Sequence, residues 1–457
     1  MRKKNQSSIR QDTINVIVHQ DRKLLELKKE IDVNRNRREA EIEFLESRLQ
    51  EMGIDLSTVK GGKPGKTVKP VMIYPAWERM CKEANDAIGN GCEIETIFTE
   101  EELRSNELAM KNLRMEYNQI HKLDNTDIAI SAIAGIVGAA VDVLLVGIPQ
   151  KGPEGLTAGP LSDFIRKKFD EAFPEVEMQK LANSKESKVP YDAQDNRHTI
   201  EYVAGLSAYY HRLLSLGHDP LLGFVVGVFD ILTGRMTTID KTGKIVSQVM
   251  ENYAERKESD IFAALAKQII HFKSDITTSM GLPVPLMGFF DLFQFGSIGE
   301  YEQTVAEVVQ SMYYEGYDFI HFCSMSIPTM VIEVVVRISY AIKRIKEGYK
   351  IKESIPFSLD REKHPKLETM LFIAHSGATA INAGKVYFSG NPMAINYPQW
   401  LAFAKYSYKQ LKWVIMEKPS ARSAYIDGRS GEEWKQILAQ VDDCFEEFSK
   451  EYIVIFE

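Results

Sequence analysis

Long apolar runs alternate with polar spacers through most of the chain, a pattern that predicts a mainly α-helical protein. Strand-like alternation of β-branched residues is scarce, with residues 452–456 the main exception. The apolar runs are residues 128–148, 220–234, 282–299, 319–342 and 370–388. The spacers are residues 182–198, 240–260 and 346–368. We therefore expect a large apolar helical core domain over residues 123–420, followed by a C-terminal helix and tail over residues 421–457.

The N-terminal region has a different pattern, typical of one long helix over residues 10–52. Apolar side chains recur at multiples of seven, as in a coiled coil, at Leu24, Ile31, Leu45 and Met52. Polar residues 34–38 interrupt this repeat, so we predict a short or imperfect coiled coil. Residues 1–58 would form a helical arm that makes homo-oligomers through residues 10–52. A Gly- and Lys-rich linker over residues 59–70 and a charged helical connector over residues 71–122 would follow.

Charge distinguishes this arm from the rest of the chain. Residues 1–70 contain 16 Lys and Arg against 11 Asp and Glu, while the whole chain carries a formal net charge of -8. The overall charge argues against nucleic-acid binding by the protein as a whole. Only the basic arm could contact nucleic acid or anionic lipid, and the plainer interpretation is a solvated helix face that mediates self-association.

Cysteine content and the first residues bear on the cellular compartment. The four cysteines, Cys81, Cys92, Cys323 and Cys444, form no CxxC pair, which argues against a disulfide framework and a structural zinc knuckle. Residues 1–20 lack the apolar segment of a signal peptide. We therefore expect a cytoplasmic, bacterial-type protein.

Residues 128–148 leave two interpretations open. The run is long enough to span a bilayer, which needs about 20 apolar residues, and Ser131, Gly135 and Ala139 have the spacing of closely packed membrane helices. Its single charge, Asp142, argues the other way, because a carboxylate in hydrocarbon costs about 2.5 to 3.5 kcal/mol. The segment is either a buried core hairpin or a membrane-inserting element that would place the protein peripherally or integrally at the inner membrane.

Carboxylates stand inside three glycine-bounded apolar runs, at Asp142, Asp230 and Asp291. A buried carboxylate needs a partner, because desolvating an unpaired one costs several kcal/mol. In the structural interpretation each aspartate caps a helix or pairs with an arginine such as Arg212 or Arg337. In the functional interpretation they gather with histidines in one metal-binding pocket.

The histidines that suit such a pocket lie in the segment YYHRLLSLGHDP, residues 209–220. Gly217 and Pro220 predict a helix end near residue 216, which leaves His218 and Asp219 at a turn. Imidazole and carboxylate groups there suit metal ligation or acid–base chemistry. The predicted catalytic residues are His218 and Asp219. The predicted metal ligands are Asp142, His211, His218, Asp230 and Asp291. The alternative is a pair of hydrogen-bonded structural histidines at a helix junction.

The same segment, with His211-Arg212 followed by His218-Asp219, resembles the HR…HS or HR…HD element of membrane-bound metal-dependent hydrolases related to zinc-dependent phospholipase C. The likeness is confined to residues 209–220, and Asp219 stands where many members carry serine. It implies a membrane-apposed hydrolase of phosphoester or lipid substrates that uses a divalent metal such as zinc. The alternatives are a scaffold with purely structural acids, and a non-enzymatic, membrane-acting helical effector of the bacterial toxin or antiphage defence type that oligomerises through its arm.

Overall fold

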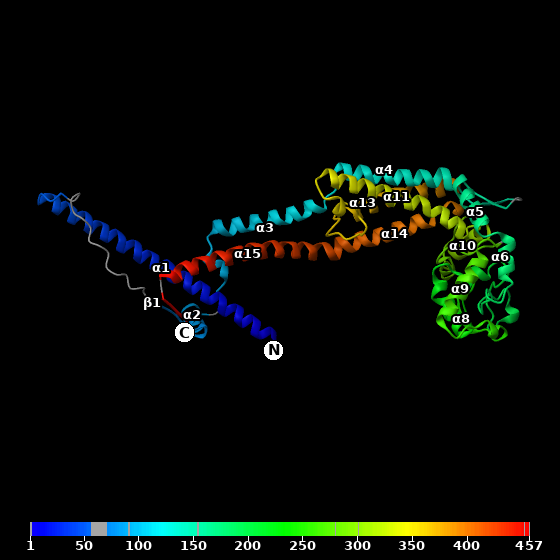
Figure 1. Ribbon diagram of the computed structural model, residues 1–457, viewed down its shortest axis with the longest axis horizontal. Coiled ribbons are helices and arrows are strands. Elements are labelled where there is room, and N and C mark those ends of the chain that lie inside the picture. Colours follow the sequence, from blue (N-terminus) through cyan, green and yellow to red (C-terminus); the bar gives the residue numbers. More distant parts are fainter. Residues whose placement is uncertain are drawn as a thin grey trace. The chain divides into compact units, whose positions relative to one another are not determined.

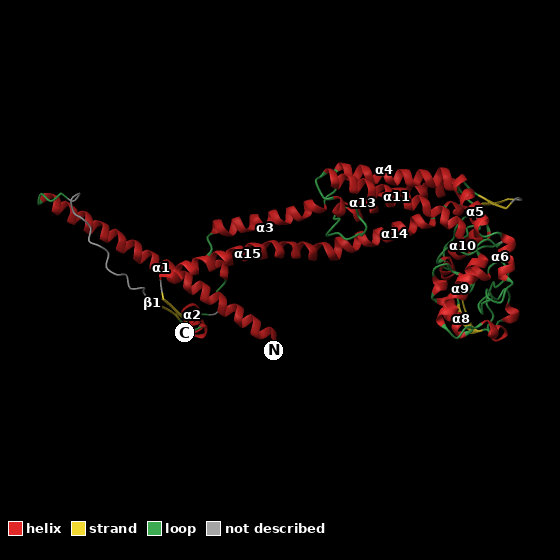
Figure 2. Cartoon of the chain, in the orientation of Figure 1, coloured by secondary structure: helices red, strands yellow, loops and turns green. Residues whose placement is uncertain are grey.

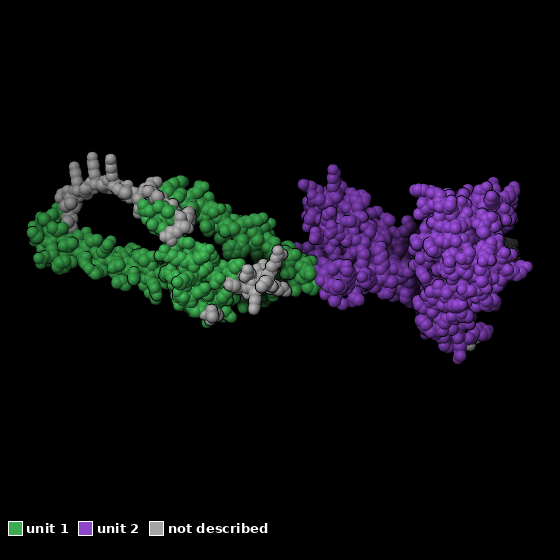
Figure 3. All heavy atoms as spheres, turned by 90° about the horizontal axis from the view of Figure 1, so that it is seen from below, with its two compact units in different colours: residues 1–119, 418–457 green, residues 120–417 purple. Residues whose placement is uncertain are grey.

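The chain folds into helices with very little sheet, as the sequence predicts (Figures 1 and 2). The computed structural model describes residues 2–55, 71–89, 92–152, 155–278, 280–299, 301–451 and 453–456. The predicted linker over residues 59–70 lies outside these residues. Two compact units are present, one formed by residues 1–119 with 418–457 and the other by residues 120–417 (Figure 3). The second unit covers nearly the same residues as the expected apolar core domain.

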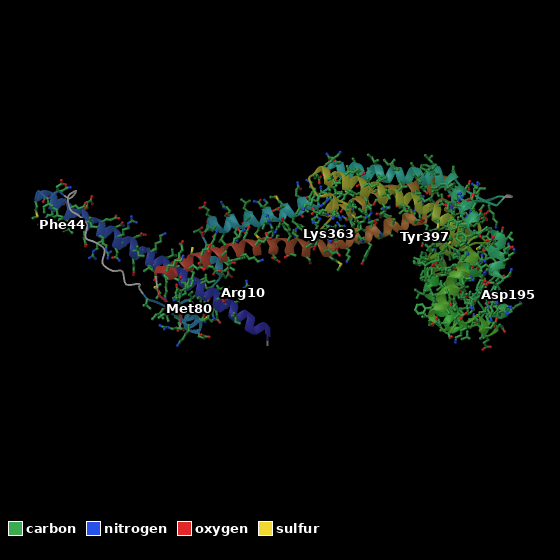
Figure 4. All side chains as sticks on the ribbon, viewed as in Figure 1. Arg10, Phe44, Met80, Asp195, Lys363 and Tyr397 are labelled. Carbon is green, nitrogen blue, oxygen red and sulfur yellow. The ribbon has the colours of Figure 1, made fainter. Side chains whose placement is uncertain are left out.

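The first unit contains the long N-terminal helix, α1 (Arg2–Glu51), which confirms the predicted helical arm. Near its start α1 packs on α2 (Trp77–Ile88), where Asn15 Nδ2 donates to Asn85 Oδ1 at 2.7 Å. Farther along, the predicted coiled-coil positions Leu24 and Ile31 are exposed, as is Phe44 (Figure 4). The second half of α1 therefore presents apolar side chains that no other described part of the chain covers.

Two further helices and a small sheet complete this unit. Residues 71–122, expected to be helical throughout, begin with strand β1 (Val71–Tyr74), which pairs in parallel with β6 (Ile453–Phe456). The short helix η2 (Ile94–Ile97) then leads to α3 (Glu100–His121). On α3, Glu116 accepts a hydrogen bond from the Tyr425 hydroxyl of α15 (Lys418–Glu451) at 2.8 Å.

Four helices pack together in the second unit (Figure 1). They are α4 (Asn125–Val141), continued by the π-helical turn η3 (Asp142–Val146); α11 (Phe319–Lys346); α13 (Leu367–Ser389); and α14 (Tyr397–Lys412), continued by η10 (Trp413–Glu417). Between α11 and α13, Ile332, Met370 and Ala374 belong to a fully buried apolar cluster. We call this assembly the four-helix bundle.

A lobe of shorter elements follows the bundle's first helix. Its helices are α5 (Pro160–Ala172), α6 (Glu175–Ala182), α7 (His211–Leu214), α8 (Val226–Thr233), α9 (Ile261–Asp275) and α10 (Val305–Tyr314). Single turns η4 (Asn196–His198), η5 (Leu216–His218), η6 (Leu222–Phe224), η7 (Glu251–Arg256) and η8 (Met287–Leu292) connect them. Strands β2 (Gln150–Gly152) and β3 (Gly155–Thr157) form one hairpin, and β4 (Arg235–Ile239) and β5 (Ile245–Val249) form another. The two remaining short helices, α12 (Ile351–Ser354) and η9 (Pro392–Ala394), flank α13.

The hairpin β4–β5 lies partly in a segment that the hydropathy pattern marks only as a polar spacer. Side chains of β5 alternate between exposed and buried, with Val246 and Gln248 facing inward. Asp240 shapes the turn by accepting hydrogen bonds from the backbone amides of Thr242 and Lys244. The polar residues of this spacer thus belong to a strand face and its turn.

All four cysteines are free thiols, consistent with the expected absence of a disulfide framework. Among the described residues, two helical stretches are long and apolar enough to cross a membrane, one ending in α4 and η3 and the other α11. Buried helices of a soluble core can meet the same criterion.

Candidate metal centre

Three imidazoles and two carboxylates meet in the lobe, at Asp192, His211, His218, His271 and Asp275. Asp192, His211 and His218 offer ligand atoms that lie within 4.8 Å of one another, and so do His218, His271 and Asp275. Elsewhere among the described residues, no other set of three or more histidine, cysteine or acidic groups does so. We call these five residues the histidine–aspartate centre.

Helix α9 supplies one wall of the centre. Asp260 caps the helix by accepting a hydrogen bond from the Ala263 amide. Gln268, His271 and Asp275 follow at spacings of three and four, so all three side chains lie on one buried face. His271 and Asp275 thus reach the centre from successive turns of the same helix.

The opposite wall is the sharply turning segment of α7 and η5. Helix α7 ends at Leu214, and η5 holds His218, in agreement with the predicted helix end near residue 216. Gly217 is needed here, because a Cβ atom on it would lie 2.7 Å from the ring of Tyr191. Gln268 of α9 links this segment to Tyr191. It accepts a hydrogen bond from the Tyr191 hydroxyl and donates one to the Gly217 carbonyl at 2.8 Å.

The orientation of two imidazoles is fixed by backbone carbonyls. His211 Nδ1 lies 2.9 Å from the Ala208 carbonyl oxygen, and His271 Nδ1 lies 2.9 Å from that of Ser187. Only a protonated Nδ1 can donate to a carbonyl, so in each neutral ring the lone pair is on Nε2. Both Nε2 atoms are buried without a hydrogen-bond partner in the described structure, as are both ring nitrogens of His218.

Distances within each of the two sets of three suit a bound metal ion. His211 Nε2 and His218 Nε2 lie 3.4 and 3.6 Å from Asp192 Oδ1. His271 Nε2 and His218 Nε2 lie 3.5 and 3.8 Å from Asp275 Oδ2. Two ligands each about 2.1 Å from a tetrahedral metal are separated by about 3.4 Å. Either set of three, Asp192, His211 and His218 or His218, His271 and Asp275, could therefore hold a divalent metal after small adjustments.

Electrostatics also favour a cation here. Burial lowers the pKa of His218 to about 4, which keeps this imidazole neutral near pH 7. Asp275 is paired with Arg212, whose Nη2 donates to Oδ1 at 3.1 Å. The centre thus contains two carboxyl groups, Asp192 and Asp275, beside a single guanidinium, Arg212.

Only part of the predicted site coincides with the centre. His211 and His218 are brought together, with ring centroids 5.3 Å apart. Asp219, the other predicted catalytic residue, is not one of the five residues of the centre. Its Oδ1 accepts hydrogen bonds from the amides of Leu221 and Leu222, and its Oδ2 accepts one from Leu286, whose φ of 65° is a strained left-handed conformation. Asp219 therefore organises the loop next to His218.

The structure does not bring the three aspartates from the apolar runs together with the histidines. Asp142 accepts hydrogen bonds from Asn382 and Asn396 inside the bundle, at 2.9 and 2.8 Å. Asp230 accepts from the Thr237 amide and hydroxyl, both at 2.8 Å, and Asp291 from Gln310 at 2.6 Å. Each carboxylate has local polar partners, and Asp142 also lies 3.4 Å from Lys385 Nζ. The partners found in the described structure are thus neither the helix caps nor the arginines that the structural interpretation expected.

Asp192, His271 and Asp275 were missed by the sequence analysis. Asp192 lies in the segment 182–198, which the hydropathy pattern marks only as a spacer. His271 and Asp275 carry a usable signal, since histidine and aspartate four apart on an amphipathic helix share a face. Joining that helix to residues 209–220, however, requires the tertiary fold. In comparisons with known proteins, no protein-family model, no curated protein and no solved structure matches this chain.

Proposed function

We propose that the histidine–aspartate centre binds a divalent transition metal, with zinc the expected ion, and that the chain is a metal-dependent hydrolase. The observation that carries the proposal is the set of three buried imidazoles whose Nε2 atoms have no hydrogen-bond partner in the described structure. Leaving such groups unsatisfied costs about 1 to 3 kcal/mol each, and a metal would remove that cost. Imidazole and carboxylate ligands suit zinc and other first-row transition metals.

The residues around the centre favour hydrolysis over a purely structural ion. A structural zinc site is closed by its protein ligands, whereas a catalytic one keeps a position open. Here the Asp192 side chain is 25% exposed, while those of His211, His218, His271 and Asp275 are nearly inaccessible. Water and substrate would therefore enter on the Asp192 side. A bound metal would lower the pKa of its water toward 7 and supply a hydroxide near neutral pH.

Phosphoesters are the proposed substrate class. The support is the resemblance of residues 209–220 to hydrolases related to zinc-dependent phospholipase C, together with the cationic Arg212 beside the centre. Arg212 is held by Asp275 and by the Thr278 hydroxyl, 2.7 Å from Nη1. Its role is thus to orient Asp275 and to offset negative charge near an anionic substrate.

The test is hydrolysis of chromogenic phosphomonoesters and phosphodiesters by the full chain supplied with zinc or manganese. We expect Asp192→Asn and His271→Ala to lower kcat/KM by at least about 100-fold, the loss typical of a disturbed metal site. The matched control is His198→Ala, a histidine that packs on Tyr253 outside the centre. Equal activity in all variants, or none in the wild type with every substrate and metal, would overturn the proposal.

A membrane-acting effector without catalysis is the second candidate, favoured by the exposed apolar side of α4. Leakage of dye-loaded vesicles distinguishes the two functions. If the chain is an effector, wild type and His271→Ala should release equal amounts of dye. The hydrolase proposal predicts that any release by wild type is lost in His271→Ala.

A further inference from the structure

The outer side of α4 carries only apolar side chains from Ile128 to Leu145. Asp142, the one charged residue in this stretch, is buried on the opposite side. The exposed large residues of the stretch are Ile128, Ile133, Ile136, Val137, Val143, Leu144 and Leu145. In the most apolar 18-residue stretch of the helical segment Glu100–Val146, only 33% of the residues are buried. The core helix of a soluble protein is mostly buried.

Helix α11 packs beside α4 and carries an exposed apolar stripe of its own. Met330, Val334, Ile338 and Ile342 follow one another at spacings of four and are all exposed. Side chains at this spacing line one side of a helix. We call the exposed residues of α4 and this stripe of α11 the α4–α11 face.

The inner side of α4 is made of small residues. A Cβ atom on Gly138 would lie 2.3 Å from Ile332 Cγ1 of α11, and one on Gly135 would lie 2.6 Å from the Ala374 carbonyl oxygen of α13. A water-soluble amphipathic helix turns its large apolar residues toward the core and its polar residues toward water. In α4 the small residues face inward and the large apolar residues face outward. The arrangement is typical of helices that pack together in lipid.

Polar groups lie within the bundle and at its ends. Inside, Gln399 Nε2 donates to the Thr379 hydroxyl at 3.1 Å, and Asp142 is held by its two asparagines. At the start of α4, Asp127 pairs with Lys343 and Lys366. The apolar side of α4 and η3 therefore starts beside charged groups. From Ile128 to Leu145 its 18 residues span about 27 Å at about 1.5 Å each, close to the roughly 30 Å hydrocarbon core of a bilayer.

We propose that the α4–α11 face lies against the hydrocarbon of a lipid bilayer. A bilayer fits better than a second copy of the chain, because the face has no hydrogen-bonding group across a length that matches the bilayer. At the far end of α13, Tyr387 and Phe388 are strongly exposed, as expected for aromatic residues at a membrane interface.

The test is flotation of the full chain with vesicles of phosphatidylcholine and phosphatidylglycerol. We expect wild type to float with the vesicles and the double variant Ile133→Lys/Ile136→Lys to do so at least about tenfold less, because lysine is costly in hydrocarbon. Phe262→Lys, at an even more exposed apolar position on α9, is the matched control and should float as wild type does. Circular dichroism checks that each variant is folded.

Two outcomes would overturn the proposal. One is wild type that stays with the soluble fraction, and the other is a folded double variant that floats as well as wild type. If wild type does not float but is a dimer in sedimentation, and the double variant is a monomer, the face belongs to a second copy. The proposal is independent of the histidine–aspartate centre, since metal binding and hydrolysis are not measured here.

Discussion

Asp291 is a buried carboxyl group whose ionisation should weaken the fold. It lies in η8, is 1% exposed, and accepts a hydrogen bond at Oδ1 from Gln310 of α10. Its Oδ2 atom has no hydrogen-bond partner in the described structure. Burial raises the pKa of Asp291 to about 7 from an ordinary value of 3.8. The folded chain therefore binds a proton at Asp291 that the unfolded chain has already released above pH 4.

The sign of the effect follows from this difference. A group that binds its proton more tightly in the folded state makes folding less favourable as pH rises from about 4 to about 7, with no further change above. Each pKa unit corresponds to about 1.4 kcal/mol, so ionising Asp291 costs on the order of 4 kcal/mol. Asp291→Asn keeps an oxygen acceptor and cannot ionise. Relative to wild type, the variant should be about equally stable at about pH 4.5 and clearly more stable at about pH 8.

Urea denaturation at both pH values measures the difference in the free energy of unfolding between the variant and wild type. Hydrogen exchange in α10 then measures the local stability beside Asp291. The matched control is Asp442→Asn, an exposed aspartate on α15, which should leave the pH dependence unchanged. Asp291→Asn should also retain wild-type metal content, because Asp291 lies outside the centre. Parallel curves for wild type and Asp291→Asn, with equal stability at both pH values, would refute the reasoning.

Three further predictions concern the centre's surroundings and the arm. Asp219→Ala leaves three backbone amides without their acceptor, so the free energy of unfolding should fall by at least about 2 kcal/mol in urea titrations; an unchanged value would refute its loop-organising role. Gly217→Ala should cost about 1 to 3 kcal/mol through contact with Tyr191, whereas Gly428→Ala, with nothing within 4 Å of the added Cβ, should be neutral or stabilising in the same titration. Leu24→Ser/Ile31→Ser should reduce an oligomer to monomers in sedimentation equilibrium; a monomeric wild type would contradict self-association through α1.

Local sequence signals predicted the fold class well. The heptad-like spacing around Leu24 and Ile31 predicted a long helix, and α1 is one. Gly217 and Pro220 predicted the chain reversal that puts His218 in a turn. These features depend on residues close in sequence, so propensity and spacing suffice to find them.

The composition of the centre could be predicted only in part, because its residues come from separate segments. His211 and His218 were identified from one segment, but Asp192 and His271 approach them only through folding. The prediction of metal ligands in the apolar runs rested on a valid physical reason, namely that a buried carboxylate needs a partner. It named Asp142, Asp230 and Asp291. Their partners include neutral groups, such as Asn382 and Thr237, and one lysine, Lys385, none of which hydropathy patterns can assign to them.

Elemental analysis of the purified full chain tests the central claim most directly. The account predicts close to one zinc or other transition metal ion per wild-type chain, and a large loss of that metal in the folded variant His218→Ala/His271→Ala but not in His198→Ala. It also predicts that a chelator lowers the thermal stability of wild type. Metal far below one ion per chain, together with unchanged stability in the chelator, would contradict the account.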